Sequence, residues 1–224
     1  LPRLAGIWLP DETRIEIEGR PGWQQGAVTL PQLRYLTGSC TLAKVEQVAL
    51  GRSQQRWQLS AQRVTLNSAC WQSLPPQPAS AVPRTLADWQ QRLPGADVHI
   101  GRLAVLPWQH YAGELDLTLA PEQQQLRYRG DNLSLSARLQ GQTLTVDSLK
   151  LQHPFLTQPL ALHGSVALPT FADGLPVTGA LQSELSVAQW PQPLTLDLQW
   201  QQQQGKLIVQ EQGDETPLLE LPWQ

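Results

Sequence analysis

The stretch from Gly113 to Leu151 reads GELDLTLAPEQQQLRYRGDNLSLSARLQGQTLTVDSLKL, and apolar and polar residues alternate along most of it. Successive side chains of a β-strand point to opposite faces of a sheet. This alternation therefore predicts strands with one apolar face and one polar face. We expect four strands here, at residues 113–119, 125–128, 132–139 and 143–147.

The alternation changes phase near Ser148. Leu144 and Val146 occupy even positions, whereas Leu149 and Leu151 occupy odd positions. A β-bulge adds one residue to a strand, which would bring all four apolar side chains to the same face. We therefore expect a bulge or a bend at this point.

The rest of the chain repeats such half-apolar segments, so the predicted fold class is all-β and mainly antiparallel. We expect a curved, partly open β-sheet groove with one short amphipathic helix. The 19 prolines oppose long helices. The helix is expected at 85–93, where Leu86, Trp89 and Leu93 recur at helical spacing before Pro94. No helical pattern interrupts residues 96–224, which argues against alternating strands and helices.

Composition predicts three regions. Residues 1–73 form an N-terminal β region that contains both cysteines, residues 74–84 form a proline-rich linker, and residues 85–224 form the helix followed by a β-groove. The groove pattern stops midway at the C-terminal end, and the chain contains no methionine. We therefore expect the sequence to be a fragment of a longer protein. No stretch approaches the roughly 18 apolar residues of a membrane-spanning helix.

The two cysteines, Cys40 and Cys70, are open to two interpretations. They are either free thiols or a disulfide. A disulfide would close a loop of about 30 residues and stabilise the fold by roughly 3–4 kcal/mol. A metal site is disfavoured because two isolated cysteines without a nearby histidine supply too few ligands.

Charge and motifs exclude several classes of function. The net charge is -3, and no basic stripe interleaves with aromatic residues, so we expect no nucleic-acid partner. The sequence lacks the Gly-x-Ser-x-Gly motif of a nucleophile elbow, and its glycines are spread over turns. The histidines lack metal-ligand spacing, and Glu114 and Asp116 are typical of the polar side of a strand. We interpret the chain as a non-enzyme without a metal or cofactor.

The apolar face has two possible roles. In a closed or paired sheet it fills a conventional core. In an open, curved sheet it lines a trough that could hold acyl chains, at about 0.8 kcal/mol for each buried CH₂ group. Periodicity does not separate these cases, and the assignment inverts if the polar face is the concave one. The candidate lining residues are Leu115, Leu117, Leu119, Leu133, Leu135, Leu139, Leu144 and Val146.

Family resemblance rests on short matches that occur in the same order along the whole chain. They are Leu4-Ala-Gly-Ile-Trp-Leu-Pro10, Leu33-Arg-Tyr-Leu36 with Gly38 and Cys40, Ser68-Ala-Cys70, Thr85-Leu-Ala87, Trp89-Gln90, Pro107-Trp-Gln109, Gln125-Leu-Arg-Tyr128, Gly141-Gln142, Leu144-Thr-Val146, Asp173-Gly-Leu-Pro-Val177, Leu207-Ile-Val209, Pro217-Leu-Leu219 and Leu221-Pro-Trp-Gln224. On these residues the chain resembles the YdbH-like family of AsmA-like envelope proteins of Gram-negative bacteria. None of the matches is a catalytic signature.

The resemblance implies a long β-sheet bridge that an N-terminal helix anchors in the inner membrane. Such a bridge crosses the periplasm with a continuous hydrophobic groove, through which phospholipids move toward the outer membrane. By resemblance, the partners are the outer-membrane lipoprotein YnbE and the periplasmic protein YdbL. The present chain would be the N-terminal periplasmic part, just after the anchor. An oxidising periplasm also favours the Cys40–Cys70 disulfide.

Two other classes of function stay open at this point. A closed β domain could act as an adaptor that docks the bridge to inner-membrane partners without binding lipid. A carbohydrate-binding or hydrolytic β domain could use exposed indoles, for which Trp108, Trp190 and Trp200 are the candidates.

Overall fold

The structure is a computed structural model that describes residues 13–73, 90, 95–168, 178–188, 190–202, 204–214 and 216–223. These residues form β-strands with short connections and two 3-10 helices, η1 (Ser68–Ser73) and η2 (Gln109–Tyr111). The strands are β1 (Thr13–Glu18), β2 (Gly22–Gln24), β3 (Ala27–Thr37), β4 (Cys40–Ser53), β5 (Arg56–Asn67), β6 (Ala96–Leu106), β7 (Gly113–Leu119), β8 (Gln123–Gly130), β9 (Leu133–Gln140), β10 (Thr143–Leu151), β11 (Leu160–Ala167), β12 (Thr178–Leu185), β13 (Leu194–Gln201), β14 (Gln204–Glu211) and β15 (Pro217–Trp223).

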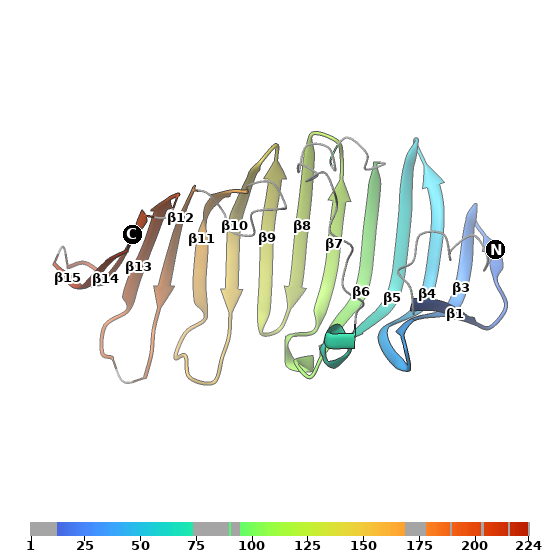
Figure 1. Ribbon diagram of the computed structural model, residues 1–224, viewed down its shortest axis with the longest axis horizontal. Helices are drawn as coiled ribbons and strands as arrows, with labels where there is room; N and C mark the ends of the chain where they lie inside the picture. Colours follow the sequence, from blue (N-terminus) through green and yellow to red (C-terminus); the bar gives the residue numbers. More distant parts are fainter. Residues whose placement is uncertain are drawn as a thin grey trace. The chain divides into compact units, whose positions relative to one another are not determined.

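The chain divides into two compact units. The first unit comprises Leu1–Ala81 and Pro94–Thr118, and the second comprises Val82–Leu93 and Leu119–Gln224. In the first unit the strands follow the order β1-β3-β4-β5-β6-β7, with β2 paired to β3 (Figure 1). The pairing of β5 with β6 is parallel, whereas the pairs among β1 to β5 are antiparallel.

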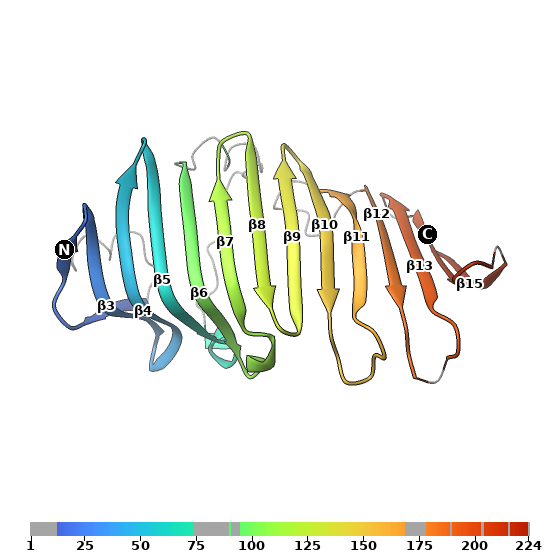
Figure 2. The same ribbon diagram turned by 180° about the vertical axis from the view of Figure 1, so that it is seen from behind.

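In the second unit, strands β8 to β15 follow one another in chain order, and every neighbouring pair is antiparallel. Figure 2 shows β8 to β13 side by side from behind. Within neither unit do the described strands close into a barrel. The predicted fold class, an all-β and mainly antiparallel open sheet, is confirmed.

The predicted helix and linker fall largely outside the described residues. Within 85–93 the structure describes only Gln90, which is helical, and residues 74–84 lie outside the described part. The division into regions 1–73, 74–84 and 85–224 stays a prediction. Within the described residues, no helix combines the length and apolar character needed to cross a membrane.

The register of the second unit sorts its side chains onto two faces. Residues directly opposite each other on paired strands share a face. Leu139 pairs with Leu144, which pairs with Val166, and the same relation continues through β12 to β15. We call the resulting surface the apolar face; its residues on β8 to β15 are Gln124, Leu126, Tyr128, Leu133, Leu135, Ala137, Leu139, Leu144, Val146, Leu149, Leu151, Leu160, Leu162, Gly164, Val166, Gly179, Leu181, Ser183, Leu185, Leu194, Leu196, Leu198, Trp200, Gly205, Leu207, Val209, Glu211, Leu219, Leu221 and Trp223.

A bulge in β10 explains the change of phase near Ser148. Val146 pairs with Ala137, but the next paired residue of β10 is Ser148, opposite Ser136. Asp147 is therefore the extra residue, and Leu149 and Leu151 return to the apolar face. The Arg138 guanidinium holds Asp147 with three hydrogen bonds of 2.6, 3.0 and 3.2 Å. The predicted bulge is confirmed, and an ion pair fixes it on the polar face.

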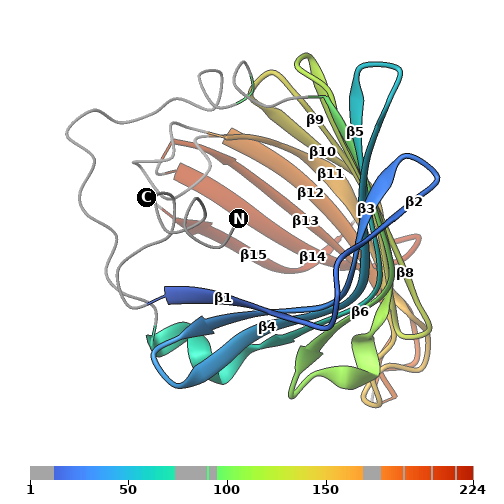
Figure 3. The ribbon, with the colours of Figure 1, turned by 90° about the vertical axis from the view of Figure 1, so that its right-hand side faces the viewer.

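The strands of the first unit contain an aligned irregularity. One residue in each of four strands has no partner in the strand register, although the residues on either side of it are paired. These skipped residues are Pro31 on β3, Gln47 on β4, Gln62 on β5 and Gly101 on β6. Gln47 has a φ angle of 51°, and a Cβ on Gly101 would lie 3.1 Å from the Gln62 carbonyl oxygen. Such irregularities bend a strand. Figure 3 shows the strands of this unit, including β4 and β5, bending along their length.

The skipped residues also explain the sequence pattern of these strands. On one side of the skipped residues, a cross-strand row consists of Leu30, Val48, Ala61 and Ile100. On the other side, three positions away in each strand, the row consists of Leu33, Val45, Val64 and Leu103. A spacing of three would place the two rows on opposite faces of a regular strand. The extra residue keeps both rows on one face.

A disulfide ties the first unit together. Cys40, at the start of β4, is bonded to Cys70 in η1, with a Cα–Cα distance of 5.7 Å. Cys70 has no exposed surface. The predicted bridge is confirmed, and it joins the β3–β4 hairpin to the turn that follows β5.

Candidate functional site

Five of the predicted lining residues lie together on the apolar face of the second unit. Leu133, Leu135 and Leu139 come from β9, and Leu144 and Val146 come from β10. Leu139 is directly opposite Leu144, and the other three are opposite Leu151, Leu149 and Ala137. All five are half-buried. Their role as lining residues for a lipid stays a prediction.

The other three predicted lining residues lie on β7. Asp116 is hydrogen-bonded to His99 of β6 on the polar face. Its two neighbours in the strand, Leu115 and Leu117, therefore point to the opposite face. That face of the first unit also carries Val98 and Ile100, which flank His99 on β6. Leu119 ends the strand, and all three leucines are half-buried.

The described part of the second unit forms a single layer. The substantial contacts of its strands are with their neighbours in the sheet, and no described strand stacks across the apolar face. Among the apolar residues of this face, only the small Ala137 and Val166 are buried, at 8% and 9% exposure. Most of its leucines keep part of their surface accessible, and Leu219 and Leu221 of β15 are 45% and 48% exposed. An apolar surface of this extent is typical of a binding site.

One border of the apolar face is occupied by Gln90. This side chain is 5% exposed, and its Nε2 atom donates hydrogen bonds of 2.9 Å to Oε1 of Gln124 and to the carbonyl oxygen of Gly141. Gln124 shares its row with Leu139, so Gln90 lies where the β8 and β9 rows end.

The same border row contains two glycine–tryptophan pairs. Gly179 is opposite Trp200, and Gly205 is opposite Trp223. The indole of each tryptophan covers the glycine of the preceding strand, at distances that leave no room for a Cβ atom. A large ring over a glycine fills the gap that the missing side chain leaves. Trp200 therefore has a packing role on the apolar face.

Glu211 is the one charged residue among those of the apolar face. It is directly opposite Leu194, two residues beyond Val209, and is half-buried. Its Oε1 atom accepts a 3.0 Å hydrogen bond from Nε1 of Trp190. Sequence reasoning missed this residue, although its parity with Leu207 and Val209 would have placed it on the apolar face.

Ion pairs in both units lie on the polar face. Arg56 makes two hydrogen bonds to Asp97, of 2.7 and 3.0 Å, and Gln58 adds a third of 2.8 Å. Hydrogen bonding to the Arg56 guanidinium holds the pKa of the Asp97 carboxyl below its ordinary value. The hydrogen bond from Lys44, supported by Arg63, likewise lowers the pKa of Glu46. These contacts join neighbouring strands and leave the opposite face to apolar side chains.

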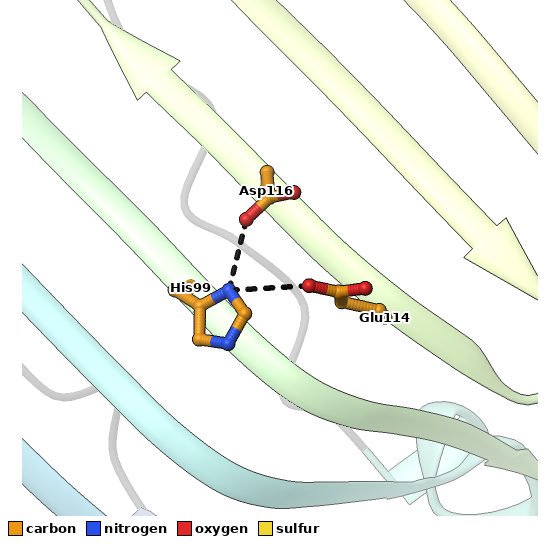
Figure 4. A group of neighbouring side chains, drawn as sticks. All are labelled: His99, Glu114 and Asp116. Carbon is orange, nitrogen blue, oxygen red and sulfur yellow. Dashed lines mark hydrogen bonds and ion pairs between the residues drawn. The ribbon is translucent and has the colours of Figure 1, made fainter.

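A small ionic cluster also lies on the polar face of the first unit (Figure 4). Nδ1 of His99 is 2.8 Å from Oδ1 of Asp116 and 3.7 Å from Oε1 of Glu114. The three side chains offer ligand atoms within 4.8 Å of one another. Next to them is an open hollow of about 530 Å³, lined in part by small residues such as Ala49 and Gly51. The sequence pattern does not predict that His99 lies beside these carboxylates. The contact depends on β6 and β7 being neighbours in the sheet. A hydrogen bond between partly exposed side chains accounts for the contact of His99 with Asp116.

Comparison with known proteins places this chain in a family. The family model described as YdbH-like, intermembrane phospholipid transport protein YdbH, matches residues 1–224. The chain belongs to the YdbH-like family. A curated relative, the probable phospholipid transport protein YdbH of Escherichia coli strain K12, is 41% identical over 225 residues.

The YdbH-like relative is much longer than this chain. The match covers 100% of the chain but 26% of the relative. No solved structure shows a significant match to the chain. The chain thus spans about a quarter of the length of this relative.

Proposed function

We propose that this chain is a segment of a periplasmic bridge that carries phospholipids between the inner and outer membranes. In the second unit, the acyl chains would lie on the apolar face, with Leu133, Leu135, Leu139, Leu144 and Val146 among the lining residues. On β7, the proposed lining residues are Leu115, Leu117 and Leu119. The observation that carries the proposal is the apolar face of β8 to β15, which continues from strand to strand without a covering layer of described strands.

The dimensions of the apolar face suit an acyl chain. Four rows of side chains along a strand, such as Leu133 to Leu139, span about 20 Å at the rise of a β-strand. One lipid tail occupies about 15 Å, which is half of the bilayer hydrocarbon core. The backbone groups are already hydrogen-bonded within the sheet, so a tail lying on it meets mainly side-chain carbon. Each CH₂ group that leaves water contributes about 0.8 kcal/mol.

The bend of the first unit supports the apolar side of the sheet as the concave, lipid-binding side. Three apolar residues within two positions of the skipped residues are less than 10% exposed: Val48, Ala61 and Val64. The side chains of Arg63 and Lys44, on the opposite face, are 55% and 42% exposed. Side chains converge on the inside of a bend and spread on its outside, so the apolar side fits the concave side.

The family supports the proposed compartment, and the proposed partners rest on the family resemblance. A YdbH-like segment with a disulfide fits the oxidising periplasm. We propose that the longer protein is anchored in the inner membrane and acts with the outer-membrane lipoprotein YnbE and the periplasmic protein YdbL. The proposed activity is lipid transfer by binding, without a chemical step.

Native mass spectrometry of the purified chain tests the proposal. The chain is exchanged from detergent micelles that contain a defined phospholipid into a volatile buffer. Adducts of phospholipid mass that survive gentle activation support the lipid-carrying segment. A mass of the protein alone, at lipid concentrations that saturate a fatty-acid-binding protein run as control, would contradict it and favour the closed adaptor. Quenching of tryptophan fluorescence by oligosaccharides would instead favour the carbohydrate-binding alternative.

A further inference from the structure

The position of Glu211 on the apolar face calls for a physical reason. A charged group on an apolar surface loses part of its hydration, which is unfavourable unless a polar partner compensates. Glu211 is half-buried opposite Leu194, at the end of β14. Two ion pairs of the second unit, Arg138 with Asp147 and Lys206 with Glu220, lie on the polar face.

Within the described residues, the Glu211 carboxylate has one side-chain partner, the indole N–H of Trp190. Trp190 follows β12 in the connection to β13, and its indole is partly accessible, at 41% exposure of the residue. A single N–H group uses one of about four acceptor positions of a carboxylate and does not neutralise its charge. The carboxylate is thus held in place with acceptor capacity left, and no cationic side chain of the described residues is seen to pair with it.

A carboxylate beside an indole is a suitable receptor for an ammonium group. The carboxylate accepts N⁺–H hydrogen bonds, which are stronger than neutral ones, and an indole face attracts cations within about 6 Å. Glu211 lies in the outermost row of the apolar face on β12 to β14, the row of Leu185 and Leu194. A lipid whose tail lies on the inner rows would place its headgroup at such a border.

We propose that Glu211, positioned by Trp190, binds the ammonium group of a zwitterionic phospholipid headgroup and disfavours anionic phospholipids. The inference rests on the proposed function, since it requires acyl chains on the apolar face. Phosphatidylethanolamine supplies the ammonium group, whereas phosphatidylglycerol with the same tails brings a net negative charge toward the carboxylate. The two lipids therefore differ at the place where Glu211 acts and nowhere on the acyl chains.

A competition experiment on the 224-residue chain tests the inference. The chain is incubated with detergent micelles that contain equal amounts of phosphatidylethanolamine and phosphatidylglycerol with identical acyl chains. Native mass spectrometry then measures the ratio of the two bound lipids. We expect the wild-type chain to enrich phosphatidylethanolamine about threefold to fivefold, as up to about 1 kcal/mol of partly exposed ion pairing gives. Glu211→Gln should return the ratio to that of the micelles without lowering the total bound lipid.

Glu184→Gln is the matched control, because Glu184 is an exposed carboxylate on the polar face of β12, opposite Thr195. This variant should keep the wild-type ratio. Trp190→Phe, which keeps a ring but removes the indole N–H, should lower the enrichment. Thermal unfolding verifies that each variant is folded at the temperature of the experiment.

The outcomes separate the two proposals. Lipid binding without enrichment by the wild-type chain, or with an enrichment that Glu211→Gln leaves unchanged, overturns the headgroup inference and leaves the proposed function standing. The absence of any bound lipid overturns both.

Discussion

Trp200 and Gly179 fill one cross-strand position between them. The indole of Trp200 lies within 3.0 Å of the point where a Cβ atom on Gly179 would stand. Trp223 repeats the relation over Gly205, and the pairs are consecutive in the same row of the apolar face. Two large rings thus cover two strands whose glycines offer no side chain of their own. This arrangement keeps the row apolar and fixes the orientation of each indole.

Gly179→Ala should destabilise the second unit. The new methyl group would overlap the Trp200 ring, and overpacking of this kind costs about 1–3 kcal/mol. Thermal and urea unfolding of the purified chain measures the change. Gly95→Ala is the control, because a Cβ there would meet Arg56 at 3.4 Å, an ordinary contact. Equal stability losses in the two variants would contradict the packing role of Trp200.

Loss of the disulfide should loosen the first unit alone. Replacing both Cys40 and Cys70 with serine removes a link across a loop of about 30 residues, which is worth about 3–4 kcal/mol. Hydrogen exchange measured by mass spectrometry should become faster in the β3–β4 hairpin and in η1. The exchange of β12 to β14 should stay unchanged, because these strands belong to the second unit. Uniformly faster exchange would show that the two units unfold together.

The ion pair between Arg56 and Asp97 should make stability depend on pH. Because the pKa of Asp97 is held below its ordinary value of 3.8, its contribution is present above that pH and is lost as pH falls through the lowered pKa. Both side chains are about one-third exposed, so the pair should contribute less than about 1 kcal/mol. Urea unfolding of the wild type and Asp97→Asn should differ near neutral pH and converge in acid. Asp131→Asn, at an exposed turn residue, should match the wild type throughout.

Local patterns were sufficient to predict the strands and their faces. The phase change at Ser148 located the β10 bulge, because one extra residue reverses parity in a single strand. The Cys40–Cys70 bridge followed from the family resemblance and its compartment. Residues 85–93 were predicted as a helix from spacing, and only Gln90 of them lies in the described part.

Features that depend on several strands at once could not be predicted in this way. Val45 and Val48 are three residues apart, a spacing that also fits a helix, and only the matching skips in β3, β5 and β6 identify a bend. His99 and Asp116 meet because β6 and β7 are neighbours, although a long connection precedes β6 and η2 precedes β7. Parity predicts the face on which Glu211 lies. It does not predict the contact with Trp190, which is 21 residues away in the sequence.

A charge at the centre of the apolar face should abolish lipid binding while the sheet stays folded. Leu135 is half-buried between Tyr128 and Leu149, so Leu135→Glu would place an unpaired carboxylate where the acyl chains are proposed to lie. Ser134→Glu is the matched control, because Ser134 lies on the polar face between Arg129 and Lys150. Native mass spectrometry should show phospholipid bound to the control and none bound to Leu135→Glu. Circular dichroism should show the same strand content in both. Lipid binding by a folded Leu135→Glu variant would remove this residue from the lining and favour a different surface as the path of the lipid.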